Sequence, residues 1–295
     1  MRKMLYYFVI NLFLLSFLGV LKSCYLYQIN LYDNYSYDTM LDALGIHLTY
    51  YGVLVVFAIY LVLNNFFNTE LKKQKIMSVL LLCFFYVFLL FLATRIIIVA
   101  CILITVFMFL KYLKWKPLLV VTFLGLISFT LLYVNNSSYV ITRFKNAFYV
   151  EADGNTDMSS REIHWKSVIN SLKSKQAYVI GNGIGDKQKK LNQEYLSINF
   201  HGAESAYNAH NQFLEVLVAT GFFGLFIFLL NFTFMIFCAI KTKNEALFIL
   251  QIIFILTCIT ESMFERQLGI ITYLTLNSLL LFSFVNSTKG KFIKG

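Results

Sequence analysis

Long apolar runs recur along this chain of 295 residues, and they constrain its fold more than any other feature. A helix needs about 20 apolar residues, each adding about 1.5 Å, to cross the hydrocarbon of a bilayer. Eight runs approach this length, and we expect spans at 4–21, 44–63, 77–94, 96–110, 118–134, 213–240, 246–262 and 268–285. The sequence therefore predicts an all-α integral membrane protein with about eight transmembrane helices.

The composition fits lipid better than water. Only 14% of the residues are charged, whereas soluble proteins are about a quarter charged. The net charge of +10 could indicate nucleic-acid binding, but most basic residues stand in short clusters between apolar runs, as orientation signals do. We therefore expect no nucleic-acid partner. The five cysteines have neither metal-ligand spacing nor a disulfide pattern, so we interpret them as apolar residues of helices.

Two of the runs need interpretation. A single helix over 77–110 would be too long for one bilayer, and Arg95 divides this stretch, so we expect a re-entrant turn or a tight helical hairpin there. The first run follows Arg2 and Lys3 and could be a signal peptide. It lacks a small-residue cleavage site, and we interpret it as a retained span.

Lysine and arginine in the short loops give the orientation. With a cytoplasmic N-terminus, most of them fall on the inner side, and the short outer segments hold only Lys22, Arg95 and Arg266. We expect both termini in the cytoplasm and a large periplasmic loop between spans five and six. The predicted parts are a transmembrane hairpin (1–76), spans three to five (77–134), the loop (135–212) and spans six to eight (213–295).

The large loop is the place with room for a site in water. Ser159 and Glu162 form a capping-box pattern that predicts a following helix. Its apolar stripe indicates an amphipathic helix lying on the outer leaflet or on the bundle, with the stripe made of Trp165, Val168, Ile169 and Leu172. A glycine turn follows at Gly181–Asp186. It is not a dinucleotide fingerprint, because its third glycine comes one residue early.

Two arginines are candidates for binding an anion. Arg95 is costly in hydrocarbon; it could extend to the outer headgroups, or its planar fork could meet a phosphate. Arg161 lies in the first turn of the predicted loop helix, where the dipole disfavours a cation. It could hold an anionic ligand or be an ordinary surface residue. Trp165, one turn further, could stack on the guanidinium or on a sugar face.

His210 lies where the polar loop enters the sixth span. Asn208 is a plausible N-cap, which would put His210 in the first turn, where the helix dipole favours the neutral imidazole. Such a ring could act as a general base, or it could simply bind a backbone carbonyl. Glu261 and Glu265, four residues apart on one predicted helical face, could orient a histidine or a sugar hydroxyl, or form a solvated charge cluster. His164, His201 and His210 show no metal-ligand spacing, so we expect no metal site.

The order of motifs between residues 161 and 225 is distinctive. It runs Arg161…Trp165, then Gly181-Asn182-Gly183-Ile184-Gly185, then Ala209-His210-Asn211-Gln212-Phe213-Leu214-Glu215, then Gly221-Phe222-Phe223-Gly224-Leu225. This order resembles the bacterial O-antigen ligase / O-antigen polymerase superfamily, polytopic enzymes that handle undecaprenyl-diphosphate-linked glycans. Arg95 fits too, because the family has an arginine at the outer start of a span two before the large loop. The resemblance covers about 77–285, and its combined motifs are moderately specific.

The resemblance implies a helical bundle in the bacterial inner membrane with a large periplasmic loop. It implies glycosyl transfer from a lipid-diphosphate donor to an acceptor hydroxyl, without metal or nucleotide cofactor. Arg95 and Arg161 would hold the diphosphate, and His210 would act on the hydroxyl. The glycine turn would shape the outer cavity. We expect supporting roles for the site residues Trp165, Asn211, Glu215, Glu261 and Glu265. Family members usually have additional helices before the matched region.

Several functions fit these expectations. The first is a polymerase that joins repeat units into surface polysaccharide, such as O-antigen, capsule or exopolysaccharide. The second is a ligase that moves finished glycan to lipid A core or to a protein. A transporter or flippase of the lipid-linked unit would instead predict mid-span charges and paired broken helices. A non-catalytic scaffold would tolerate loss of His210. Polysaccharide-assembly machinery is a possible partner for the first two.

Overall fold

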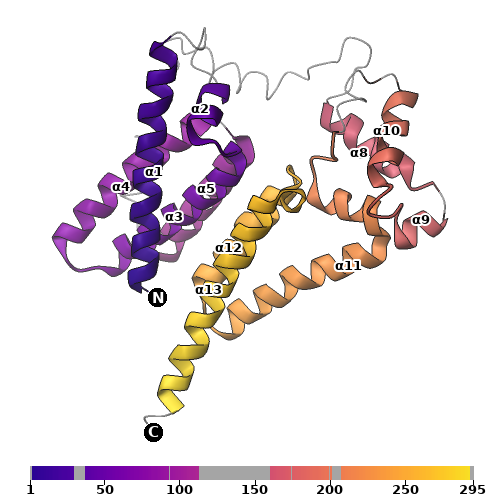
Figure 1. Cartoon of the computed structure of the whole chain (residues 1–295). Helices are drawn as coiled ribbons and strands as arrows, with labels where there is room; N and C mark the ends of the chain where they lie inside the picture. The colour runs from indigo at the N-terminus through magenta and orange to yellow at the C-terminus, as the bar shows by residue number, and fades with distance from the viewer. Residues whose placement is uncertain are drawn as a thin grey trace. The chain divides into compact units, whose positions relative to one another are not determined.

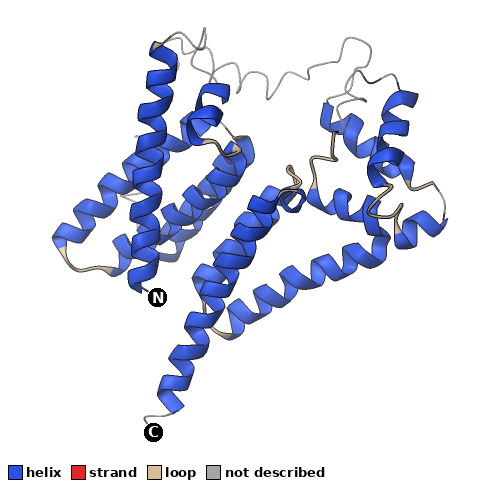
Figure 2. Ribbon diagram, in the orientation of Figure 1, coloured by secondary structure: helices blue, strands red, loops and turns tan. Residues whose placement is uncertain are grey.

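The computed structural model describes residues 2–29, 37–92, 94–112, 160–173, 175–198, 200 and 207–292. Within these ranges every regular element is a helix, which confirms the all-α prediction (Figure 2). The chain divides into two compact units, Met1–Phe148 and Tyr149–Gly295. The expected fifth span, the start of the large loop and Ser159 lie outside the described residues.

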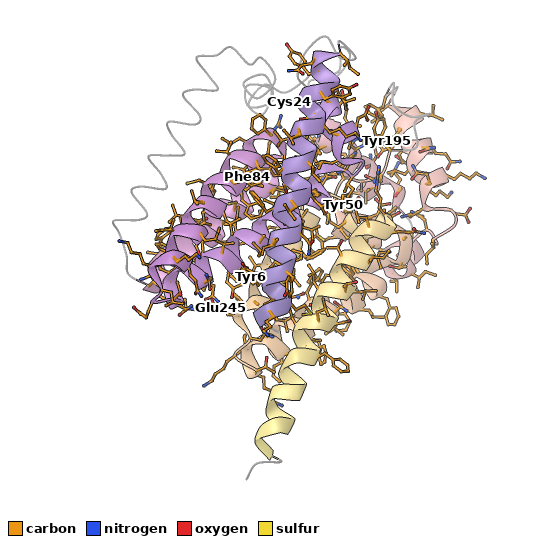
Figure 3. All side chains as sticks on the ribbon, turned by 60° about the vertical axis from the view of Figure 1, so that its left-hand side comes forward. Tyr6, Cys24, Tyr50, Phe84, Tyr195 and Glu245 are labelled. Carbon is orange, nitrogen blue, oxygen red and sulfur yellow. The ribbon has the colours of Figure 1, made fainter. Side chains whose placement is uncertain are left out.

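The first unit is built around one buried helix. Its elements are α1 (Arg2–Gln28), α2 (Tyr37–Leu44), α3 (Leu48–Asn68), α4 (Lys72–Leu92) and α5 (Arg95–Tyr112) (Figure 1). Helix α3 is buried along most of its length and packs against α1, α4 and α5. Aromatic rings join the outer helices: Phe84 of α4, labelled in Figure 3, contacts Phe13 of α1 at a centroid distance of 4.7 Å. The unit also confirms the break at Arg95, since α4 ends at Leu92 and α5 begins at Arg95.

The second unit consists of a small helical domain and a group of apolar helices. The domain contains α8 (Ser160–Ser171), α9 (Lys175–Ile180) and α10 (Lys187–Ser197); the apolar helices are α11 (Gln212–Lys241), α12 (Glu245–Cys258) and α13 (Gln267–Phe292), with the short 3-10 helix η2 (Met263–Glu265) between the last two. Helix α11 belongs to both parts, because its start packs on α8 and α9 and its remainder packs on α12. The domain's core includes Val168, Leu172, Leu191 and Val218.

Helix α11 is interrupted at Gly221, whose φ of 67° and ψ of −167° are not helical. A break of this kind frees the carbonyls of the preceding turn. Two of them accept hydrogen bonds from the glycine turn: Asn182 N donates to Val218 O (2.9 Å), and Gly183 N donates to Ala219 O (3.0 Å). A Cβ at Gly221 would collide with the backbone of Val179. The glycine turn therefore supplies hydrogen-bond donors to two of the freed carbonyls of α11.

Buried amides and a tyrosine join the three apolar helices. Gln251 of α12 donates to Asn277 of α13 (2.6 Å), and Tyr273 Oη of α13 donates to Asn231 of α11 (2.6 Å). Such bonds hold helices together where lipid provides no competing partner. Of the described helices, α1, α3, α4, α5 and α11 are long and apolar enough to cross a membrane, while α12 and the apolar start of α13 are shorter.

The amphipathic helix of the loop exists, but its buried face differs from the predicted stripe. Val168 and Leu172 are fully buried, whereas Trp165 and Ile169 are 36% and 46% exposed. Ile163 and His164 occupy the buried face in their place. Helix α8 turns this face toward α10 and the start of α11. The prediction was wrong here because a polar histidine was not counted as part of an apolar face.

Candidate active site: a histidine loop at the start of α11

His210 lies one residue before the N-cap of α11, outside the helix. Asn211 is the N-cap, and its Oδ1 accepts hydrogen bonds from Phe213 N (2.9 Å) and Leu214 N (3.1 Å). The prediction that Asn208 caps the helix and that His210 sits in its first turn was therefore wrong. Asn208 Oδ1 instead accepts from His210 N (3.0 Å). The backbone of His210 has a positive φ of 46°, an uncommon conformation for a residue with a side chain.

A buried ion network fixes the loop that carries His210, residues 207–211, which we call the histidine loop. Glu215, 1% exposed, accepts a hydrogen bond from Ala209 N (2.8 Å) and another from Lys187 Nζ (2.8 Å). Lys187 Nζ also pairs with Glu265 at 2.7 Å. Burial lowers the pKa of Lys187, but the hydrogen bonds and charges of Glu215 and Glu265 outweigh it and raise the pKa above its usual value. The ammonium is therefore permanently charged at neutral pH.

Glu261 faces His210 from the turn after α12. Its Oε2 lies 3.7 Å from His210 Nδ1, which is an ion-pair distance once the imidazole is protonated but too long for a hydrogen bond. The prediction that Glu261 and Glu265 share a helical face was wrong, because α12 ends at Cys258 and the two residues lie in a turn and in η2. Glu261 faces His210, whereas Glu265 pairs with Lys187. Gln212 Oε1, which accepts from Phe264 N at 2.6 Å, ties this turn to α11.

His164 joins the candidate site, although the sequence did not predict it there. It is 3% exposed, its Nδ1 lies 2.8 Å from Tyr195 Oη, and its ring centroid is 5.3 Å from that of His210. Burial, with the nearby charges of His210 and Arg161, lowers the pKa of His164 to about 4. The ring is therefore neutral at pH 7. A sequence signal existed, since His164 follows Arg161 by three residues and so shares its side of α8.

Aromatic rings surround the two histidines. The ring centroids of Phe200 and Tyr207 lie 5.5 Å and 5.6 Å from that of His164, and Tyr195, labelled in Figure 3, lies at 5.3 Å. The side chain of His210 remains 34% exposed, and Tyr207 is 42% exposed. The partly exposed imidazole of His210 thus lies against the buried, neutral imidazole of His164, and aromatic rings surround both.

Arg161 lies beside this cluster in the first turn of α8. Its side chain is exposed, and its charge contributes to the lowered pKa of His164. Within the described part of the chain it forms no ion pair with a carboxylate; the neighbouring Glu162 pairs with Lys166 at 2.8 Å. Because the side chain is exposed, an anion in solvent can reach the guanidinium.

A model of the O-Antigen ligase family matches residues 76–229, which is more than half of the chain. The chain belongs to the O-antigen ligase family. The match contains α8 to α10, the histidine loop and the kink in α11. Membership indicates a multi-pass membrane protein with an O-antigen ligase- or polymerase-like function, that is, an enzyme that transfers glycan between a lipid-linked form and an acceptor. No curated protein matches the chain.

The family match also contains Arg95, which belongs to the first unit. There it is exposed and is the first residue of α5. That Arg95 binds a diphosphate together with Arg161 stays a prediction. Glu261 and Glu265 lie beyond the end of the match at residue 229, yet within their own unit they reach His210 and Lys187. In this member of the O-antigen ligase family, the segment between α12 and α13 thus contributes charged groups to the candidate site.

Proposed function

We propose that this chain is a membrane glycosyltransferase that polymerises undecaprenyl-diphosphate-linked oligosaccharide repeats into surface polysaccharide. The observation that carries the proposal is the pairing of His210 with Glu261 at 3.7 Å, on a backbone loop fixed by Glu215. A half-exposed imidazole next to a carboxylate is the arrangement that a general base needs, because the carboxylate stabilises the imidazolium that forms.

In the proposed reaction, an acceptor sugar hydroxyl attacks the anomeric carbon of the donor. His210 Nε2 takes the hydroxyl proton as the new C–O bond forms, and Glu261 compensates the positive charge at Nδ1. The bond between the anomeric carbon and the diphosphate oxygen breaks, and undecaprenyl diphosphate leaves with the electron pair. Attack opposite the leaving group inverts the anomeric centre.

The leaving diphosphate gains negative charge, and arginines can stabilise that charge in the transition state. We assign this part to Arg161, which is exposed beside the histidine cluster, and to Arg95 at the start of α5. The planar guanidinium forms paired hydrogen bonds with phosphate oxygens and stays charged at any working pH. No metal ion or nucleotide takes part in the proposed step.

We propose the periplasmic side of the inner membrane for this chemistry, with both termini in the cytoplasm. Helix α11 begins at the histidine loop and carries Lys241 in its last turn. The basic cluster at Lys241 and Lys243 supports a cytoplasmic end there, because short cytoplasmic loops are rich in lysine. The acceptor is the growing glycan on its own carrier lipid, and polysaccharide-assembly machinery is the expected partner.

Complementation of a strain that lacks the gene tests the proposal, with surface glycan separated on a gel. His210→Ala is expected to collapse the ladder to a single repeat, because loss of a general base costs about 10²–10⁴-fold in rate. Glu261→Gln is expected to shorten the chains rather than abolish them. Lys166→Ala, a change in an exposed surface pair, is the control and should leave the ladder intact.

The ladder also separates the two reactions that the family performs. Full-length chains stranded on the carrier lipid in His210→Ala would identify a ligase and overturn the polymerase proposal. An unchanged ladder in His210→Ala, at equal protein level, would end the proposal that His210 is the base.

A further inference from the structure

The small domain of the second unit carries an exposed apolar patch on one side. We call it the α9 patch, and it consists of Tyr178, Val179, Ile180, Ile184, Phe222 and Phe223. Exposure is high for such residues: 76% for Ile184 and 66% for Phe223. A patch of this kind is costly in water and usually marks a contact with protein or lipid.

The position of the α9 patch along α11 can be compared with the thickness of a bilayer. From Phe222 to Lys241 the helix is about 30 Å long, which matches the hydrocarbon thickness of a bilayer. The hydrocarbon boundary therefore falls near the kink at Gly221. Val179 and Ile180 lie at the same height, because a Cβ at Gly221 would meet their backbone atoms.

The patch also adjoins the exposed apolar side of α11 beyond the kink. Phe226, Ile227 and Leu230 follow Phe222 along α11 and are 60%, 52% and 46% exposed. Tyr178 stacks on Phe222 with an interplanar angle of 14°, and α9 packs against α11, so the apolar surfaces of the two helices adjoin. Figure 1 shows the two helices side by side. An aromatic residue with a polar end is the type that gathers at the membrane interface.

We propose that α9 and the glycine turn lie in the outer leaflet, with the α9 patch facing bulk phospholipid. Ile184 at the tip of the turn inserts below the headgroups, and Tyr178 sits at the boundary. Lys189 and Lys190, exposed at the start of α10, meet the phosphate groups. The two hydrogen bonds between the glycine turn and α11 couple this insertion to the helix that begins at the histidine loop.

Site-specific photocross-linking tests this placement. The cross-linking amino acid p-benzoylphenylalanine is placed at Ile184, at Phe226 as the positive control, and at Gln193, which is exposed further along α10, as the negative control. Each full-length variant is reconstituted in phosphatidylethanolamine–phosphatidylglycerol vesicles that contain no polyprenyl lipid. After irradiation, mass spectrometry of the intact chain measures the fraction that carries a phospholipid adduct.

We expect the adduct fraction at Ile184 to be within threefold of that at Phe226 and at least tenfold above that at Gln193. An adduct fraction at Ile184 no higher than at Gln193 would overturn the proposal. Cross-linking of Ile184 to the first unit, or to a second copy of the chain, would overturn it as well, since the patch would then be a protein interface. No glycan transfer is measured, so failure of the proposed function leaves this test unaffected.

Discussion

The two parts of α11 show how one helix serves two environments. Before Gly221, its inward residues Glu215, Leu217 and Val218 are buried in the small domain. After Gly221, large apolar residues such as Phe226 and Phe234 are each 60% exposed. The first part is held by side-chain packing and an ion network, whereas the second needs lipid around it. The difference teaches that sequence hydrophobicity alone does not separate a span from the domain helix that continues it.

The kink at Gly221 separates the two parts, and breaking it should have the largest effect. In Gly221→Val the new side chain would need a positive φ and would collide with the backbone of Val179. We expect loss of more than about 5 kcal/mol and no folded second unit. Thermal unfolding in detergent, followed by size-exclusion chromatography, measures this. Gly185→Ala, with open space around it, should change stability by less than about 1 kcal/mol. A folded Gly221→Val protein would contradict the close approach of Gly221 to the backbone of Val179.

Lys187→Met tests the ion network of the first part. It leaves the carboxylate of Glu215 buried without its cation, which costs about 3–5 kcal/mol. Lys187→Met combined with Glu215→Gln should recover part of this loss, because a neutral amide needs no counter-charge. Lys189→Met, on the exposed side of the same helix, is the control. Equal thermal midpoints for Lys187→Met and Lys189→Met would rule out the network as a source of stability.

A matched pair of truncations compares the two parts directly. Leu217→Ala opens a cavity in the domain core and should cost about 2–5 kcal/mol. Phe226→Ala removes a larger side chain, yet it should cost less than about 1 kcal/mol, because lipid fills the space and no cavity remains. Thermal midpoints in lipid nanodiscs measure both. A larger loss for Phe226→Ala would indicate that protein, rather than lipid, covers the second part.

The smallest expected effect is a pH dependence from His164. Its pKa is about 4 in the folded chain, below the usual value near 6.5, so between these values the unfolded chain binds more protons. The contribution of His164 to stability is therefore fully present above pH 6.5 and is lost as the pH falls toward 4. The midpoint difference between pH 7 and pH 4.5 should be smaller in His164→Gln. An equal difference in both proteins would show that His164 does not titrate in this way.

The sequence was sufficient for features that bilayer thickness dictates. The break at Arg95 follows from thickness, because no single helix over 77–110 fits, and α4 and α5 do separate there. The all-α class follows from the same constraint. Cap positions were less determined, since Asn208 and Asn211 are equally good N-caps by residue type, and only the folded backbone distinguishes them.

The contacts of the candidate site could not be read from sequence, because its members are far apart in the chain. Glu261 reaches His210 across 51 positions, and only the fold of α11 and α12 brings them together. His164 was overlooked because its spacing of three residues from Arg161 is a weak signal, and a histidine on an apolar face is commonly a core residue. Helix α10 was not predicted, because lysine, glutamine and other polar residues dominate its sequence. Its buried residues are Leu191 and Tyr195 alone, too few to give a clear apolar pattern.

The segment of α11 from Asn211 to Gly221 has a length that is fixed at both ends. One end is set by the capping bonds of Asn211, and the other by the hydrogen bonds that the glycine turn makes to the last carbonyls before the kink. Inserting or deleting one residue between them would rotate the histidine loop by about 100° around the helix axis relative to the turn. The length of this segment therefore cannot change without turning His210 to another side of the helix relative to the glycine turn.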